Sequence, residues 1–189
     1  MNKKWNALGL GLGLLLTATL GSAGAAELRK VQYDKSAVNF SYKQMGVAMD
    51  GKFKKFAADL AFDPAKPQSA RAKLDVDLAS VDAGSSDADD EVVGREWFNT
   101  KSFPKATFVS SAIKPLGSNR YEVAGKLSIK GQSRDIRFPA TFSPVGNGGV
   151  FDGAFTIRRG DFAIGEGAWS KFDIVANDVQ VKFRITAAP

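Results

Sequence analysis

Hydrophobic and polar residues alternate along most of this chain. Near its C-terminal end, Val179, Val181, Phe183 and Ile185 are separated by single polar or charged residues. A repeat of two residues places one face of a β-strand in a hydrophobic core and the other face in water. The same kind of pattern predicts strands over residues 38–45, 51–56, 58–62, 70–78, 106–113, 121–129, 134–142, 150–157 and 179–186.

Sequences typical of turns separate these predicted strands. They include Asp63-Pro64, Gly117-Ser118-Asn119, Lys130-Gly131-Gln132 and Gly146-Asn147-Gly148-Gly149. Glycine, proline, asparagine and aspartate each favour backbone conformations that turns require. Many short strands at this spacing are typical of an antiparallel sandwich or barrel. We therefore predict an all-β fold of antiparallel strands, with about eight strands if they close into one barrel.

One segment, residues 85–97, departs from the alternation and is predicted to form a short helix. Ser85 and Ser86 are candidates for the N-cap. Acidic side chains then crowd the first turn, where they favour the positive end of the helix dipole; they are Asp87, Asp89, Asp90 and Glu91. Their alternation also suggests a calcium loop, but the glycine and the distant glutamate of such a loop are not at the required positions. We expect a capped helix that lies across one opening of the barrel.

The N-terminal segment has the pattern of a secretory signal peptide. Two lysines precede a charge-free run over residues 5–26, which has an apolar centre over residues 7–20 and ends in small residues. A membrane anchor is the alternative, but a spanning helix needs about 20 apolar residues. We predict that residues 1–26 are a signal peptide, cleaved after Ala25 or Ala26.

Cleavage would leave residues 27–189, which are enough for one domain with a full core. We expect this exported domain in the periplasm, with secretion as the alternative. The chain has no cysteine. Its stability must therefore come from the burial of its core and not from disulfides, although export would permit them.

The chain also has no histidine. The two missing residue types exclude thiol nucleophiles, the usual zinc ligand sets, Ser-His-Asp catalysis and a histidine pH switch. An enzyme that uses carboxylates such as Asp63, Asp161 and Glu166 is the alternative, but no pattern places two of them together. We therefore expect a protein that is not an enzyme, with no catalytic residues and no metal site.

The net charge of the chain is moderately positive. There are 26 lysines and arginines against 20 acidic residues, a formal charge of +6, and removing Lys3 and Lys4 leaves 24 against 20. The basic residues are spread along the strands, and the densest group is Lys52, Lys54 and Lys55. A nucleic-acid-binding protein more often gathers them on one face together with aromatic residues. We expect no nucleic-acid partner, and a weak, transient attraction to anionic membrane surfaces.

Fourteen phenylalanines are distributed over the predicted strands and their ends. A solid core is the simplest explanation for any one of them. A barrel of eight strands, however, has an interior just wide enough to hold one small ligand. Each methylene removed from water contributes about 0.8 kcal/mol, so ten enclosed methylenes would contribute about 8 kcal/mol before the entropic cost of binding. A barrel lined in this way is suited to a hydrocarbon chain.

From Tyr33 to Thr186 the sequence resembles the YceI-like family. The matching elements appear in order and are Val38-Asn39-Phe40, Met45-Gly46, Gly51-Lys52-Phe53, Phe62-Asp63-Pro64, Asp75-Val76-Asp77, Trp97-Phe98-Asn99, residues 103–108, Gly125-Lys126-Leu127 and residues 159–164. The resemblance implies an exported bacterial protein with a lipocalin-like barrel that binds polyisoprenoids and related lipids. Family members often carry histidines before Met-Gly and in the helix region, where this chain has Gln44, Gly94 and Glu96. A head-group contact by those histidines is therefore not expected here.

The resemblance and the strand pattern together predict a protein that holds a long apolar lipid inside its barrel, for transport or storage. The expected ligand is a polyisoprenoid, an isoprenoid quinone or a fatty-acid derivative, with no other cofactor. The expected lining residues are Phe40, Phe53, Phe62, Leu74, Val76, Trp97, Phe98, Phe108, Leu127, Ile129, Phe138, Phe155 and Phe162. The alternative is an interaction or inhibitor module of the cell envelope with a filled barrel. The protein is expected to be a monomer or a homodimer.

Overall fold

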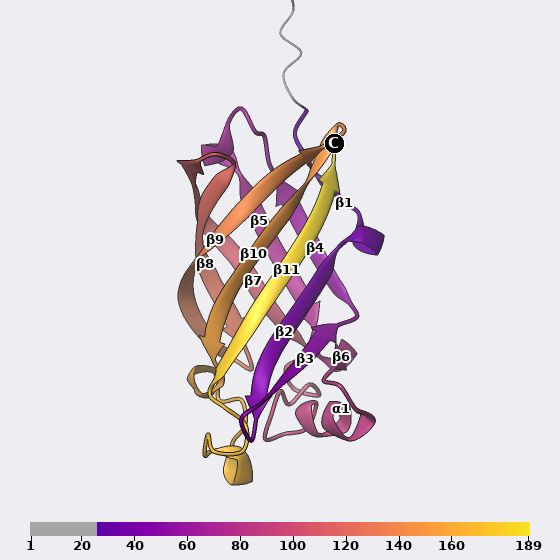
Figure 1. Cartoon of the computed structure of the whole chain (residues 1–189), viewed down its shortest axis with the longest axis vertical. Coiled ribbons are helices and arrows are strands. Elements are labelled where there is room, and N and C mark those ends of the chain that lie inside the picture. Colours follow the sequence, from indigo (N-terminus) through magenta and orange to yellow (C-terminus); the bar gives the residue numbers. More distant parts are fainter. Residues whose placement is uncertain (1–25) are drawn as a thin grey trace, which may run out of the picture.

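The computed structural model describes residues 26–189, and these form one antiparallel sheet that curls into a barrel (Figure 1). In this part of the chain there are eleven strands, in the order β4-β5-β7-β8-β9-β10-β11-β2-β3-β6, with β1 paired to β11. Their bounds are β1 Lys30–Val31, β2 Ala37–Gln44, β3 Val47–Phe53, β4 Phe56–Ala61, β5 Arg71–Asp77, β6 Val81–Asp82, β7 Lys105–Gly117, β8 Arg120–Ile129, β9 Gln132–Val145, β10 Gly148–Arg158 and β11 Asp178–Ala188. The predicted all-β, lipocalin-like fold is confirmed. The predicted signal peptide lies almost entirely outside the described residues.

The strand count exceeds the predicted eight in part because two of the strands are very short. Strands β1 and β6 have only two residues each, too few to show an alternation. The predicted strand over residues 51–56 was wrong, because β3 ends at Phe53 and β4 begins at Phe56. Strand β3 instead starts at Val47, after a two-residue turn in which Met45 and Gly46 both have positive φ. Such turns match the twist of the two strands that they join.

The helix forms where it was predicted but is shorter. Helix α1 spans Ser86–Val92, and the Ser85 hydroxyl accepts a hydrogen bond from the Ala88 N–H at 3.2 Å. The Asp89 carboxylate accepts a hydrogen bond from the Ala83 N–H at 2.6 Å, which ties α1 to the segment before it. Figure 1 shows α1 at the same end of the barrel as the connection between β10 and β11. None of the helices among residues 26–189 is long and apolar enough to span a membrane.

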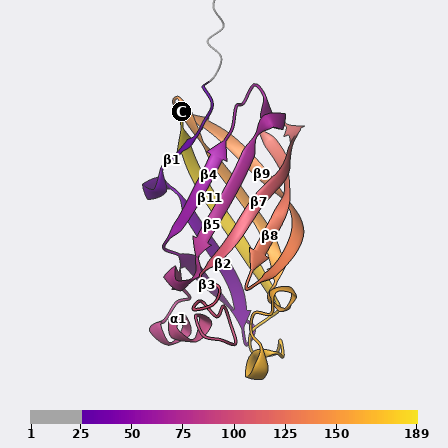
Figure 2. The same cartoon turned by 180° about the vertical axis from the view of Figure 1, so that it is seen from behind.

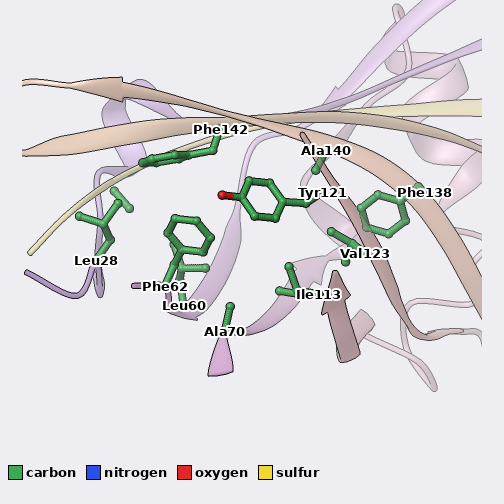
Figure 3. Packing of buried hydrophobic residues seen from close by; sticks show 11 residues of the cluster. Leu28, Leu60, Phe62, Ala70, Ile113, Tyr121, Val123, Phe138, Ala140 and Phe142 are labelled. Carbon is green, nitrogen blue, oxygen red and sulfur yellow. The ribbon is translucent and has the colours of Figure 1, made fainter. Parts of the chain in front are cut away.

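Aromatic packing closes the opposite end of the barrel (Figure 3). The Phe62 ring centroid lies 4.9 Å from that of Phe142 and 5.5 Å from that of Tyr121. Leu28 packs into the same cluster, where it pairs with Phe62 through an isolated β-bridge. Only 1 % of Phe62 is exposed. The barrel therefore has one end sealed by side chains and one end covered by α1.

The sheet does not close through a complete ladder of hydrogen bonds. Strand β4 ends one side of the strand order, and the β3–β6 pair ends the other. Figure 2 shows β4, β5, β7 and β8 along the back of the barrel, and Figure 1 shows β2 and β3 at the front. The short 3₁₀ helix Tyr33–Lys35 lies beside this gap. The Tyr33 hydroxyl accepts a hydrogen bond from the Ala58 N–H of β4 at 3.2 Å, which bridges the gap at one point.

Candidate functional site

A cavity of about 600 Å³ lies inside the barrel. Its wall is formed by alternate residues of the strands, which is the consequence of the period of two in each strand. Strand β11 shows this most clearly, because Val179, Val181, Phe183 and Ile185 all line the cavity. The volume falls in the range of about 300–1,000 Å³ that is typical of small-molecule sites. The barrel is hollow, in contrast to the filled interior of the alternative prediction.

Phenylalanine rings that lie over glycines help to keep the cavity open. Gly153 of β10 is directly opposite Phe183 of β11, and Gly51 of β3 is directly opposite Phe40 of β2. A Cβ atom added to Gly153 would come within 2.3 Å of the Phe183 ring, and one added to Gly51 within 2.2 Å of the Phe40 ring. Both glycines occupy positions whose side chains would point inward. The rings therefore lie back against the wall.

The covered end of the cavity is its mouth. Asp87, Ala88, Glu91 and Val92 of α1 belong to the cavity wall, as does Trp169 of the β10–β11 connection. The Trp169 Nε1–H donates a hydrogen bond to the Glu91 carboxylate at 2.8 Å. This contact joins two segments far apart in the sequence across the same end of the barrel. It is a link that must break if α1 and the connection separate.

Trp97 and Tyr42 line the cavity near this end. The centroids of the Trp97 and Trp169 rings are 5.4 Å apart. The Tyr42 hydroxyl donates a hydrogen bond to the Ala83 carbonyl at 3.1 Å. Burial, together with the nearby Asp89 carboxylate, raises the pKa of Tyr42, so its phenol is neutral. The mouth therefore presents aromatic and neutral groups to the cavity alongside the acids of α1.

A buried arginine organises the β10–β11 connection. Arg159 is 1 % exposed, and no carboxylate among residues 26–189 forms an ion pair with it. Its guanidinium donates instead to six backbone carbonyls, those of Ile164, Gly165, Trp169, Lys171, Val175 and Ala176, at 2.8–3.3 Å. The Trp97 and Phe172 rings lie 5.3 and 4.8 Å from its central carbon. Burial lowers the pKa of Arg159. One side chain thus holds the irregular connection in a fixed shape.

A buried lysine also stabilises the β10–β11 connection. Lys130, which is 7 % exposed, follows β8, and its Nζ donates to the Glu166 carboxylate at 2.7 Å and to the Ala163 carbonyl at 2.6 Å. The Glu96 carbonyl accepts hydrogen bonds from the N–H groups of Gly165 and Glu166, both at 2.8 Å. The connection is therefore anchored to the segment that follows α1.

The structure places the predicted lining residues in two groups. Those on the cavity wall are Phe40, Phe53, Leu74, Val76, Trp97, Phe98, Phe108, Leu127, Ile129, Phe138 and Phe155. Phe62 lies instead in the cluster that seals the far end. Phe162 is buried in the 3₁₀ helix Arg159–Phe162, where the Arg134 guanidinium lies 5.9 Å from its ring centroid. Phe62 keeps the inward direction of Ala58 and Leu60 but lies beyond the end of the cavity, whereas Phe162 lies in a 3₁₀ helix, where the two-residue alternation does not apply. Whether the wall residues contact a ligand stays a prediction.

Several wall residues were missing from the predicted set. Val179, Val181, Phe183 and Ile185 follow the alternation that predicted β11. The signal for them was therefore present in the sequence. Arg159 and Trp169 had no such signal, because they reach the mouth from an irregular connection.

The carboxylates of the enzyme alternative are dispersed. The Asp63 side chain accepts a hydrogen bond from the Ala65 N–H in the turn after β4, at the sealed end. Glu166 pairs with Lys130 beside the mouth, and Asp161 is exposed in the 3₁₀ helix after β10. Within the described part of the chain, no group of three or more acidic, histidine or cysteine side chains is placed to hold a metal ion.

Comparison with known proteins agrees with this architecture. Among solved structures, BcnA of Burkholderia cenocepacia is 45 % identical, with a TM-score of 0.82 over 84 % of this chain and all of that one. A polyisoprenoid-binding domain from Saccharophagus degradans is 17 % identical, with a TM-score of 0.66 over 88 % of this chain and 99 % of that one. That second likeness shows the shared fold.

The sequence comparisons extend over nearly the whole chain. UPF0312 proteins of Pseudomonas putida strain W619 and of Pseudomonas syringae pv. tomato DC3000 are each 30 % identical over 197 residues, covering 96 % of this chain and all of theirs. Residues 30–187 match the YceI-like domain. The chain therefore belongs to the YceI-like family.

Proposed function

We propose that this protein binds a long apolar lipid inside its barrel and carries or stores it outside the cytoplasm. The observation that supports this most strongly is the cavity of about 600 Å³, lined almost entirely by aliphatic and aromatic side chains. A polyisoprenoid, an isoprenoid quinone or a fatty-acid derivative has the chemistry that such a wall accepts. The polyisoprenoid-binding domain from Saccharophagus degradans, which shares the fold, is consistent with this ligand class.

Burial of hydrocarbon supplies the binding free energy in this proposal. Each methylene contributes about 0.8 kcal/mol when it leaves water, and about ten methylenes offset the usual entropic cost of association. The wall has no carboxylate in its middle section, where Phe108, Phe138, Leu127 and Phe155 lie. A neutral hydrocarbon tail therefore meets no unpaired charge there.

The lipid enters and leaves at the mouth that α1 covers. The sealed end has the buried rings of Phe62, Phe142 and Tyr121, which leave no comparable passage. The mouth is instead covered by one short helix and one irregular connection, joined by the Trp169–Glu91 hydrogen bond. Short elements of this kind separate more easily than paired strands.

Binding accounts for the structure better than catalysis. The ionisable groups at the mouth are engaged in structural contacts: Arg159 with backbone carbonyls, Glu91 with Trp169 and Asp89 with Ala83. None of these arrangements places an acid and a base on opposite sides of a reacting bond. A neutral head group of the lipid would lie among these residues.

The test is a binding titration of delipidated protein with farnesol, followed by the quenching of tryptophan fluorescence. Val181→Trp adds a bulky side chain to the cavity wall, whereas Lys182→Trp adds the same side chain to the outer face of the same strand. We expect V181W to weaken farnesol binding at least about tenfold, since several methylenes lose their place in the cavity. K182W should bind as the wild type does. Equal affinities for the two variants would contradict the proposal.

A further inference from the structure

A second hollow of about 500 Å³ lies in the side of the barrel, where the hydrogen-bonded sheet is incomplete. We call it the side groove. It is lined by Tyr33, by Ser36 and the first three residues of β2, and by residues 52–56 at the corner between β3 and β4. The edge-to-face pair of Tyr33 and Phe56, with ring centroids 5.6 Å apart, provides an apolar wall. The Tyr33–Ala58 hydrogen bond lies beside it.

Two residues belong to the walls of both the side groove and the main cavity. Val38 and Phe53 are directly opposite each other in the β2–β3 register, and each lines both hollows. Strands β2 and β3 are hydrogen-bonded to each other here, but neither is hydrogen-bonded to β4, whose strand partner among residues 26–189 is β5. A hydrocarbon chain can therefore pass from the groove into the cavity beside these two side chains, through the unpaired gap next to β4, with no ladder of hydrogen bonds to break.

The outer rim of the side groove is strongly basic. Lys52, Lys54 and Lys55 all line it. A single carboxylate, that of Asp82, lies 3.9 Å from the Lys52 Nζ and 3.5 Å from the Lys54 Nζ. Lys55 forms no ion pair within residues 26–189. The rim thus has three ammonium groups against one carboxylate, beside an apolar wall.

We propose that the side groove binds the anionic head group of a long-chain amphiphile, a phosphate monoester, whose tail passes beside Val38 and Phe53, through the gap next to β4, into the main cavity. An ammonium group is a strong donor to phosphate oxygens, and three of them around one opening match its charge. The inference rests on the proposed function, because the tail occupies the cavity described above. It adds a second, lateral site that prefers a charged head group.

The test compares farnesyl phosphate with farnesol, which has the same tail and no charge, on the delipidated chain in low salt. We expect farnesyl phosphate to bind the wild type about tenfold more tightly. The triple variant K52Q/K54Q/K55Q should lower the ratio of the farnesol Kd to the farnesyl phosphate Kd to about one. In the wild type, 1 M salt should lower this ratio in the same way, because it screens exposed charges beyond about 3 Å. The single variant K55Q should lose part of the preference and leaves both Asp82 ion pairs in place.

The matched control is K66Q/K114Q/K126Q, which removes three exposed lysines outside the side groove. It should keep the wild-type ratio. A preference for farnesyl phosphate that survives in K52Q/K54Q/K55Q would overturn the side groove as the head-group site. So would inorganic phosphate that binds the wild type as tightly as farnesyl phosphate does, since the site would then take a free anion. Failure of farnesol itself to bind any variant would instead overturn the proposed function.

Discussion

The Phe183 ring lies directly over Gly153 on the neighbouring strand, 2.3 Å from the point where a Cβ atom of that residue would lie. A glycine at an inward-facing position leaves the space that a side chain would fill, and a ring from the next strand covers the exposed backbone. Phe40 and Gly51 repeat this arrangement on β2 and β3. The aromatic side chains of this barrel therefore line a hollow, although their number suits a solid core.

The first prediction concerns this pair. In Gly153→Ala the new Cβ would approach within 2.3 Å of the Phe183 ring, so the ring must turn into the cavity. We expect farnesol affinity to fall several-fold and the free energy of unfolding to fall by about 1–3 kcal/mol, the usual cost of overpacking. The double variant G153A/F183L removes the ring and should restore most of the binding. If G153A alone leaves the farnesol affinity unchanged, this pair does not set the width of the cavity.

The second prediction concerns the contact that joins α1 to the β10–β11 connection. Glu91→Ala removes the acceptor of the Trp169 Nε1–H. We expect the rate of lipid release, measured by stopped-flow transfer to vesicles, to rise about threefold to tenfold, in line with the strength of a partly exposed hydrogen bond to a carboxylate. Glu91→Gln keeps an acceptor oxygen and should release lipid at nearly the wild-type rate. Identical release rates for E91A and wild type would show that the mouth opens elsewhere.

The third prediction concerns Arg159. Arg159→Met leaves six buried or partly buried carbonyls without their donor, so we expect the free energy of unfolding to fall by about 3–5 kcal/mol. Arg159→Lys supplies three donors in place of five and should lower the free energy of unfolding by less than Arg159→Met does. Chemical denaturation monitored by circular dichroism measures both. A loss under about 1 kcal/mol in R159M would mean that the connection keeps its shape without the guanidinium.

The fourth prediction concerns the sealed end. Phe62 is 1 % exposed and contacts three other aromatic rings. Phe62→Ala should lower the free energy of unfolding by about 3–5 kcal/mol through lost burial and a residual cavity. Leu116, which is 55 % exposed, provides the control, since Leu116→Ala should change stability by less than about 0.5 kcal/mol. Similar losses in both variants would contradict the role given to Phe62.

The fold could be predicted from local patterns wherever a strand has one face in the cavity and one in water. Strand β11 is such a case, and so is β5, whose inward Leu74 and Val76 alternate with charged residues. The corner at Lys54 and Lys55 could not be predicted in this way. The two-residue period breaks there, with Phe53 and Phe56 three residues apart, but this break does not show that the end of β3 pairs with β6, which is distant in sequence.

The site was predictable to the same extent as the strands. Phe108 and Phe155 lie in the middle of long strands, where the alternation fixes which side chains point inward. The alternation gives the inward direction of Phe62 but not its place beyond the end of the cavity, and it does not apply to Phe162, which lies in a 3₁₀ helix. The mouth was the least predictable part. Arg159 lies just after β10, and its burial depends on the backbone carbonyls of a connection that contains only short 3₁₀ helices.

The most direct measurement of the central claim is native mass spectrometry of the protein as it is purified, before any delipidation. A hollow apolar barrel that binds lipid should give a species heavier than the chain by the mass of one long-chain lipid, which organic extraction removes and which can be identified in the extract. The V181W variant should show little of this species. A wild-type protein that consistently has only the mass of its polypeptide, and takes up no isoprenoid or fatty-acid derivative when one is supplied, would contradict the account.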